Sequence, residues 1–212
     1  MEIVAETPAP SRSGVWRGKA LCTTEMLSKL GAADPCLREY LKAHSTVNEL
    51  LQIEIVKQPD GTGLLRCTRQ DGSVTWQKQT RHAAHFALHD LTHYAVETAL
   101  GYRRGFFGLI AEGWEVDDTT GKGARGALPD EAIEVERIVG LFDAERSSGA
   151  PLSRDEFNKF APRSLTEADI QSVRALRSAL VQQWFAIQPG QKLELTFEPA
   201  SAQSARTPTS TG

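Results

Sequence analysis

The chain has 212 residues, of which 40% are hydrophobic and 24% charged, and its formal net charge is −3. This composition is typical of a folded soluble protein with a sizeable core. A net negative charge gives no general attraction for phosphate, so we expect no nucleic-acid binding; no stretch reaches the ~18 apolar residues of a membrane helix, so we expect no membrane span.

Residues 1–13 contain two prolines and several small polar residues, and they lack a basic region followed by an apolar run. We therefore expect a flexible N-terminus without a secretory signal. The three cysteines, Cys22, Cys36 and Cys67, show no CxxC spacing. An odd number of unpaired thiols favours a reducing, cytoplasmic location and argues against a disulfide framework or a cysteine zinc site.

The next part of the chain predicts a short helix followed by a β-sheet. Asp34 and Pro35 are typical of a helix start, and this helix should run to about His44. Apolar and polar residues then alternate over 51–55, 65–67 and 74–76, with turn residues at 59–61 and 71–72. Three short strands joined by such turns predict an antiparallel meander.

From Arg81 the apolar residues follow a helical period up to about residue 100, where Gly101 is placed to end the helix. The predicted core-facing arc comprises Ala84, Ala87, Leu88, Leu91, Ala95 and Ala99, and the histidines of this segment lie on a different arc. Residues 106–114 predict a second, largely apolar helical piece. Residues 119–127 are typical of a flexible loop.

The C-terminal half predicts three helices and one strand. Pro129 begins a helix to about Arg146, Ser153 with Glu156 forms a capping box, and Thr166 begins a long helix. Alternation over 193–197 predicts a last strand, and residues 199–212 predict a disordered tail. Strands and helices come in blocks, so we expect a single α+β domain over 14–198, with a small antiparallel sheet beside the helix at 81–100.

The most informative feature is a cluster of histidines. Four of the five histidines lie between residues 82 and 93; His85, His89 and His93 recur every fourth position, and Glu97 continues the series. On a helix this spacing stacks the side chains along one side. Two histidines one turn apart are a common way for a helix to present nitrogen ligands to a metal ion.

The segment from His89 to His93 reads HDxxH, and eighteen residues separate His93 from Glu112. This pattern resembles the HExxH motif and downstream glutamate of gluzincin zinc metallopeptidases, with Asp90 in place of the motif's glutamate. The resemblance implies that His89, His93 and Glu112 bind Zn²⁺ and that Asp90 is the general base. Because aspartate is one methylene shorter, Asp90 would reach the zinc-bound water only if the metal lay closer to the helix.

A second resemblance covers HDLTHYAVE and the following GFFGL, which is similar to a block in uncharacterised bacterial proteins of this size. It implies no activity, but it would make residues 89–114 one unit that includes Glu97. Other ligand sets also fit the spacing: His85, Glu97, or a carboxylate from Glu115, Asp117 or Asp118 could complete the site. With two histidines and carboxylates, iron or manganese is as reasonable as zinc.

Two functions are consistent with these patterns. The first is a divalent-metal-dependent hydrolase acting on a peptide or small molecule. The second is a non-catalytic module in which the histidine helix is architectural and the surface binds another protein. The hydrolase requires the carboxylate of Glu112 and both imidazoles to converge on one point, whereas pairing of Glu112 with an arginine would remove the likeness to the peptidases.

Overall fold

The computed structural model describes residues 50–60, 62–79, 83–121, 123 and 125–199. These residues belong to one compact unit, Thr46–Gly212. The predicted N-terminal segment 1–13, the helix ending near His44 and residues 200–212 of the predicted tail lie outside the described residues, as does His82. The single domain over 14–198 therefore stays a prediction.

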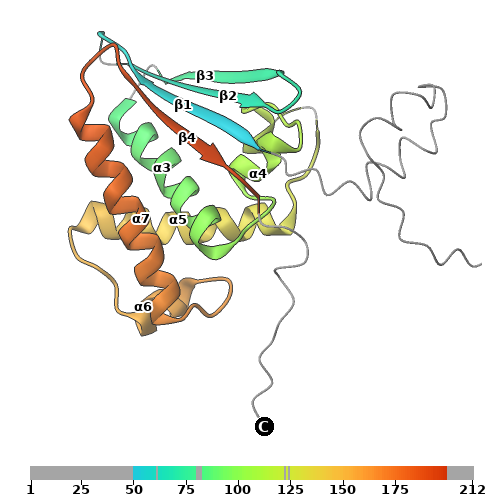
Figure 1. Ribbon diagram of the computed structural model, residues 1–212. Coiled ribbons are helices and arrows are strands. Elements are labelled where there is room, and N and C mark those ends of the chain that lie inside the picture. Colours follow the sequence, from blue (N-terminus) through green and yellow to red (C-terminus); the bar gives the residue numbers. More distant parts are fainter. Residues whose placement is uncertain (1–49, 61, 80–82, 122, 124, 200–212) are drawn as a thin grey trace, which may run out of the picture. The chain divides into compact units, whose positions relative to one another are not determined.

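The described part contains a four-stranded antiparallel sheet in the order β3-β2-β1-β4 (Figure 1). The strands are β1 Leu51–Lys57, β2 Gly63–Arg69, β3 Val74–Gln79 and β4 Lys192–Phe197. The first three strands form the predicted meander, and the predicted last strand pairs with β1. Ile53 in β1 lies opposite both Cys67 and Leu195, so the core-facing residues of the three strands are in register.

The helices are α3 Ala83–Leu100, α4 Phe106–Ala111, α5 Asp130–Ser148, α6 Arg154–Phe160 and α7 Glu167–Ala186, with a short 3₁₀ turn η1 at Asp118–Thr120. Figure 1 shows α3 and α7 side by side beneath the sheet, with α5 crossing α3 on the side away from the strands. This arrangement confirms the predicted α+β class. None of the helices in the described part is both long and apolar enough to cross a membrane.

Helix α3 occupies the centre of the core. Ala87, Leu91 and Ala95 of the predicted arc are fully buried, Leu88 and Ala99 are half-buried, and Val96, outside that arc, is buried as well. The helix ends where Gly101 takes a left-handed conformation with φ of 70°, which favours glycine. His93 is also buried, although its arc differs from the apolar one, because α5 packs over that side of α3.

The covering helices begin where their caps predict. Ser153 and Glu156 form a complete capping box at α6, and Thr166 with Asp169 forms another at α7. Helix α5 buries Ile138, Val139 and Phe142 completely, as its sequence predicts, and it presents its polar side to the histidines of α3. The position of α5 therefore decides what surrounds those histidines.

Candidate metal centre

Three polar pairs cross the interface between α3 and α5: His85 with Arg146, His89 with Asp143, and His93 with Glu136. The histidines recur once per turn of α3, and their partners come in the reverse order along α5. The two helices therefore run in opposite directions where these pairs form, and the partners on α5 are three and seven residues apart.

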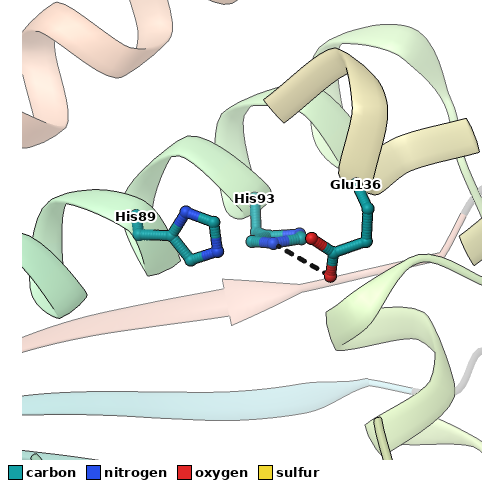
Figure 2. A group of neighbouring side chains, drawn as sticks. All are labelled: His89, His93 and Glu136. Atoms are coloured by element: carbon teal, nitrogen blue, oxygen red, sulfur yellow. Dashed lines mark ion pairs between the residues drawn. The ribbon is translucent and has the colours of Figure 1, made fainter. Parts of the chain in front are cut away.

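Two of these pairs bring together a group of metal-ligating side chains. One ligand atom each from His89, His93 and Glu136 lies within 4.8 Å of the other two. Figure 2 shows the imidazole of His89 pointing towards His93, with the carboxylate of Glu136 on the far side of His93. Nε2 of His93 is 3.5 Å from Oε1 of Glu136, and the two imidazole rings meet edge to face with centroids 4.8 Å apart.

The group combines a buried ligand with two partly exposed ones. The side chain of His93 is 2% exposed, whereas those of His89 and Glu136 are 31% and 46% exposed. A metal ion held here would have one buried ligand, His93, and two ligands that are in contact with solvent, His89 and Glu136. Catalytic metal sites likewise keep a position for a ligand from solvent.

A carboxylate lies behind each imidazole. Nδ1 of His89 is hydrogen-bonded to Oδ2 of Asp143 at 2.8 Å, whereas Nδ1 of His93 is 3.4 Å from Oε1 of Glu97 and has no hydrogen-bond partner among the described residues. When Nδ1 donates its proton to a carboxylate, Nε2 keeps its lone pair and is free to bind a metal. A hydrogen-bonded carboxylate such as Asp143 orients a ligand histidine in a metal site and raises its basicity.

Glu97 is held in place by α4. Its two carboxylate oxygens accept hydrogen bonds from the backbone N–H groups of Phe107 and Gly108, at 3.2 and 3.1 Å. Gly105 packs directly against this carboxylate, since a Cβ at Gly105 would lie 2.4 Å from Cδ of Glu97. The segment that follows α3 thus positions a buried acid beside His93, and residues 97–108 act as one structural unit.

The surrounding carboxylates change the protonation of the group. Burial by itself lowers the pKa of His93, but Glu136 and Glu97 outweigh that effect and raise the pKa to about 10. Burial raises the pKa of Glu136, yet the adjacent His93 lowers it below its ordinary value overall. The pKa of Asp143 is lowered in the same way by His89, against the effect of burial. The group therefore attracts a cation, either a proton or a metal ion.

Asp90, the predicted general base, lies apart from this group. Its side chain is buried, and its Oδ2 accepts a hydrogen bond of 2.6 Å from Nε2 of Gln79 in β3. Burial raises the pKa of Asp90 to about 6, although Gln79 and the nearby histidines lower it. Asp90 is therefore directed at the edge of the sheet, one residue away in sequence from His89.

Glu112, the predicted third ligand, is directed at an arginine. Both of its carboxylate oxygens accept hydrogen bonds from Nε of Arg104, at 2.9 and 3.0 Å. Among the described residues, the metal-ligating group takes its carboxylate from Glu136 of α5 instead. The structure thus places His89 and His93 together, as predicted, and brings neither Asp90 nor Glu112 into their group.

The other acids considered at the sequence level have different positions. Glu97 is beside His93. Glu115 forms an ion pair with Arg69 of β2, and the carboxylate of Asp117 accepts a hydrogen bond from Gln77 of β3. Both contacts join the segment after α4 to the sheet. These contacts of Glu115 and Asp117 are thus with residues of the sheet and not with the histidines.

The sequence analysis missed Glu136 and Asp143. The signal that could have found them is their spacing of seven residues, which places both acids on one side of a predicted helix. His89 and His93 are four residues apart on another helix, so two antiparallel polar stripes could have been matched. That match requires knowing that α3 and α5 pack together. The hydrophobic periodicity of each helix does not predict which helices are neighbours.

No protein-family model, curated protein or solved structure matches this chain. The fold and the site define it as an α+β protein with a His/His/Glu group that could bind a metal ion.

Proposed function

We propose that this chain binds a divalent metal ion through His89, His93 and Glu136, and that the metal serves a hydrolytic reaction. The observation that carries the proposal is the convergence of these three ligand atoms within 4.8 Å of one another. Ligand atoms at about 2 Å from a zinc ion lie roughly 3.3 Å apart. The 3.5 Å between Nε2 of His93 and Oε1 of Glu136 is already close to that separation.

The donor set fits the chemistry of a catalytic metal. Two neutral imidazoles and one carboxylate leave positions open for water or substrate, both in zinc hydrolases and in iron enzymes with two histidines and one carboxylate. A zinc ion in such a site lowers the pKa of bound water to about 7 and polarises a carbonyl oxygen. Asp143 supports this role because it holds Nδ1 of His89, which directs Nε2 towards the ion.

The assignment differs from the gluzincin pattern in its third ligand. The metal is bound through Glu136 and not through Glu112, the third zinc ligand that the peptidase resemblance implies. Asp90 could act as a base only after leaving its hydrogen bond to Gln79. The identity of the metal among zinc, iron and manganese, and the substrate, are left open by the donor set.

The observation that favours a second function is the ion pairing of His93. Between Glu136 and Glu97, a protonated His93 would join α3 to α5 without any metal. In that case the polar ladder is architectural, and the chain would act as a non-catalytic or protein-binding module.

Metal content separates the two functions. We expect untagged protein to bind about one equivalent of zinc, iron or manganese, measured by mass spectrometry and by titration of chelator-treated protein. The His89→Ala/His93→Ala and Glu136→Ala variants should lose the ion, and the matched Glu112→Ala variant should keep it. Loss in Glu112→Ala but not in Glu136→Ala would restore the gluzincin set. No uptake by the wild-type protein would leave the architectural function.

A further inference from the structure

The polar ladder between α3 and α5 continues past the metal-ligating group to an arginine. The rings of His85 and His89 are stacked, with centroids 6.3 Å apart and an angle of 17° between their planes. Nη2 of Arg146 lies 3.0 Å from Nδ1 of His85, and Nε of Arg146 donates a hydrogen bond of 3.4 Å to Oδ1 of Asp143. The other oxygen of Asp143 is bonded to His89. One carboxylate thus joins the guanidinium of Arg146 to a proposed metal ligand.

Arg146 keeps hydrogen-bond donors for a further partner. A guanidinium carries five N–H groups, and the contacts with Asp143 and His85 occupy Nε and one N–H of Nη2. In the described part of the chain, Nη1 of Arg146 makes no hydrogen bond. The side chains of Arg146 and His89 are 28% and 31% exposed, so both border the solvent where α3 meets α5.

A second arginine reaches this part of α5 from α7. Nη1 of Arg177 donates a hydrogen bond of 2.6 Å to the carbonyl oxygen of Phe142, and its guanidinium lies 5.6 Å from the centroid of the Phe142 ring. Burial lowers the pKa of Arg177, and the charge of Arg146 lowers it further, while Glu145 and Asp143 act in the opposite direction and do not restore it. The positive charge of Arg177 is therefore not fully balanced by the acids near it, and an anion bound beside Arg146 would help to balance it.

We propose that Arg146, assisted by the charge of Arg177, binds a carboxylate of the substrate while the reacting group of that substrate is bound by the metal. The inference rests on the proposed metal site and adds to it a substrate class, small molecules or peptides with a free carboxylate close to the bond that is hydrolysed. The planar guanidinium suits a carboxylate, with which it forms paired, charge-assisted hydrogen bonds. A doubly charged phosphate is less suitable, because Asp143 and Glu136 already place negative charge beside the site.

The experiment uses the full-length protein loaded with Co²⁺ and ligands that bind the metal through the same group. Succinic monohydroxamate carries a free carboxylate, its primary amide is the neutral counterpart, and a phosphonate of the same length supplies a doubly charged group. Dissociation constants are measured from the visible spectrum of Co²⁺ for wild type, Arg146→Gln, Arg146→Lys and Arg177→Gln. The matched control is Arg66→Gln, which removes an ion-paired arginine from the exposed face of β2, while α3 packs against the buried face.

We expect the wild type to bind the carboxylate about tenfold more tightly than the amide. Arg146→Gln should bring this ratio close to one, and Arg146→Lys should keep part of it, because lysine retains the charge without the planar pair of donors. Arg177→Gln should reduce the ratio by about two- to threefold, since Arg177 acts through its charge alone. Arg66→Gln should keep the wild-type ratio.

The ratio separates binding of the carboxylate from a structural role of Arg146. A variant that merely disturbs His89 or Asp143 weakens both hydroxamates and leaves their ratio unchanged. Equal affinities in the wild type, or a ratio that survives Arg146→Gln, would overturn the inference while the metal site stands. Tighter binding of the phosphonate than of the carboxylate would overturn the choice of a carboxylate. Failure of the wild type to bind Co²⁺ is a separate result, seen before any ligand is added, and it would refute the metal site and the substrate class together.

Discussion

Replacement of Asp90 by asparagine should stabilise the metal-free protein at neutral pH. Oδ2 of Asp90 accepts a hydrogen bond from Nε2 of Gln79, while Oε1 of the same glutamine is buried without a hydrogen-bond partner in the described part of the chain. An asparagine keeps an acceptor for Nε2 and adds an amide that could donate to Oε1. The variant thus removes a buried charge and satisfies an orphaned acceptor.

The size of the effect follows from the cost of ionising a buried acid. Burial raises the pKa of Asp90 from 3.8 to about 6, and each pH unit corresponds to about 1.4 kcal/mol. Because the folded-state pKa is the higher one, the stabilisation from a neutral Asp90 is complete below about pH 4 and lost as the pH rises to about 6. At pH 7.5 the loss is on the order of 3 kcal/mol, and Asp90→Asn should recover most of it.

The assay is urea unfolding of chelator-treated wild type and Asp90→Asn between pH 4 and pH 8. We expect nearly equal free energies of unfolding at pH 4 and a difference of about 2–3 kcal/mol in favour of the variant at pH 7.5. Asp155→Asn, which changes an 83% exposed carboxylate on α6, is the control and should show no such pH-dependent gain. A variant that is less stable at pH 7.5, or a difference that does not change with pH, would refute the reasoning.

Three further predictions concern the residues around the histidines. Asp143→Asn should lower metal affinity roughly 10- to 100-fold in calorimetric titration while the far-ultraviolet circular dichroism stays unchanged, because Asp143 orients His89; unchanged affinity would contradict this. Glu112→Gln should leave metal affinity within about twofold of wild type, since Glu112 binds Arg104, and a loss of the ion would reinstate it as a ligand. Gly105→Ala should lower the free energy of unfolding by about 1–3 kcal/mol, because its Cβ would lie 2.4 Å from Cδ of Glu97. Gly140→Ala is the control, because a Cβ at Gly140 meets no atom within 4 Å. Equal urea midpoints for the two variants would contradict the prediction.

Local sequence patterns were sufficient for the elements of this fold. Alternation placed the strands, the helical period placed α3 and its core face, and capping residues placed the starts of α6 and α7. These features depend on neighbours within four residues, so one stretch of chain contains all the information they need. The pairing of His89 with His93 in one group belongs to this class, because both come from a single helix.

The third member of the group could not be chosen in this way. Glu112 had the spacing of a known motif, yet in the structure its carboxylate accepts a hydrogen bond from Arg104, and Glu136 lies beside His93 instead. Glu136 is 43 residues from His93, and only the packing of α5 across α3 makes them neighbours. The same packing supplies Asp143 behind His89.

For the described residues, the sequence by itself thus determined the strands, the helices, the α+β class and a helix that presents two imidazoles on one side. The tertiary structure alone decided which carboxylates meet those imidazoles and which of these side chains are buried. The physical reason is one of range: backbone hydrogen bonding and hydrophobic periodicity act over a turn or a strand, whereas a site is assembled by the burial of apolar faces far apart in the chain.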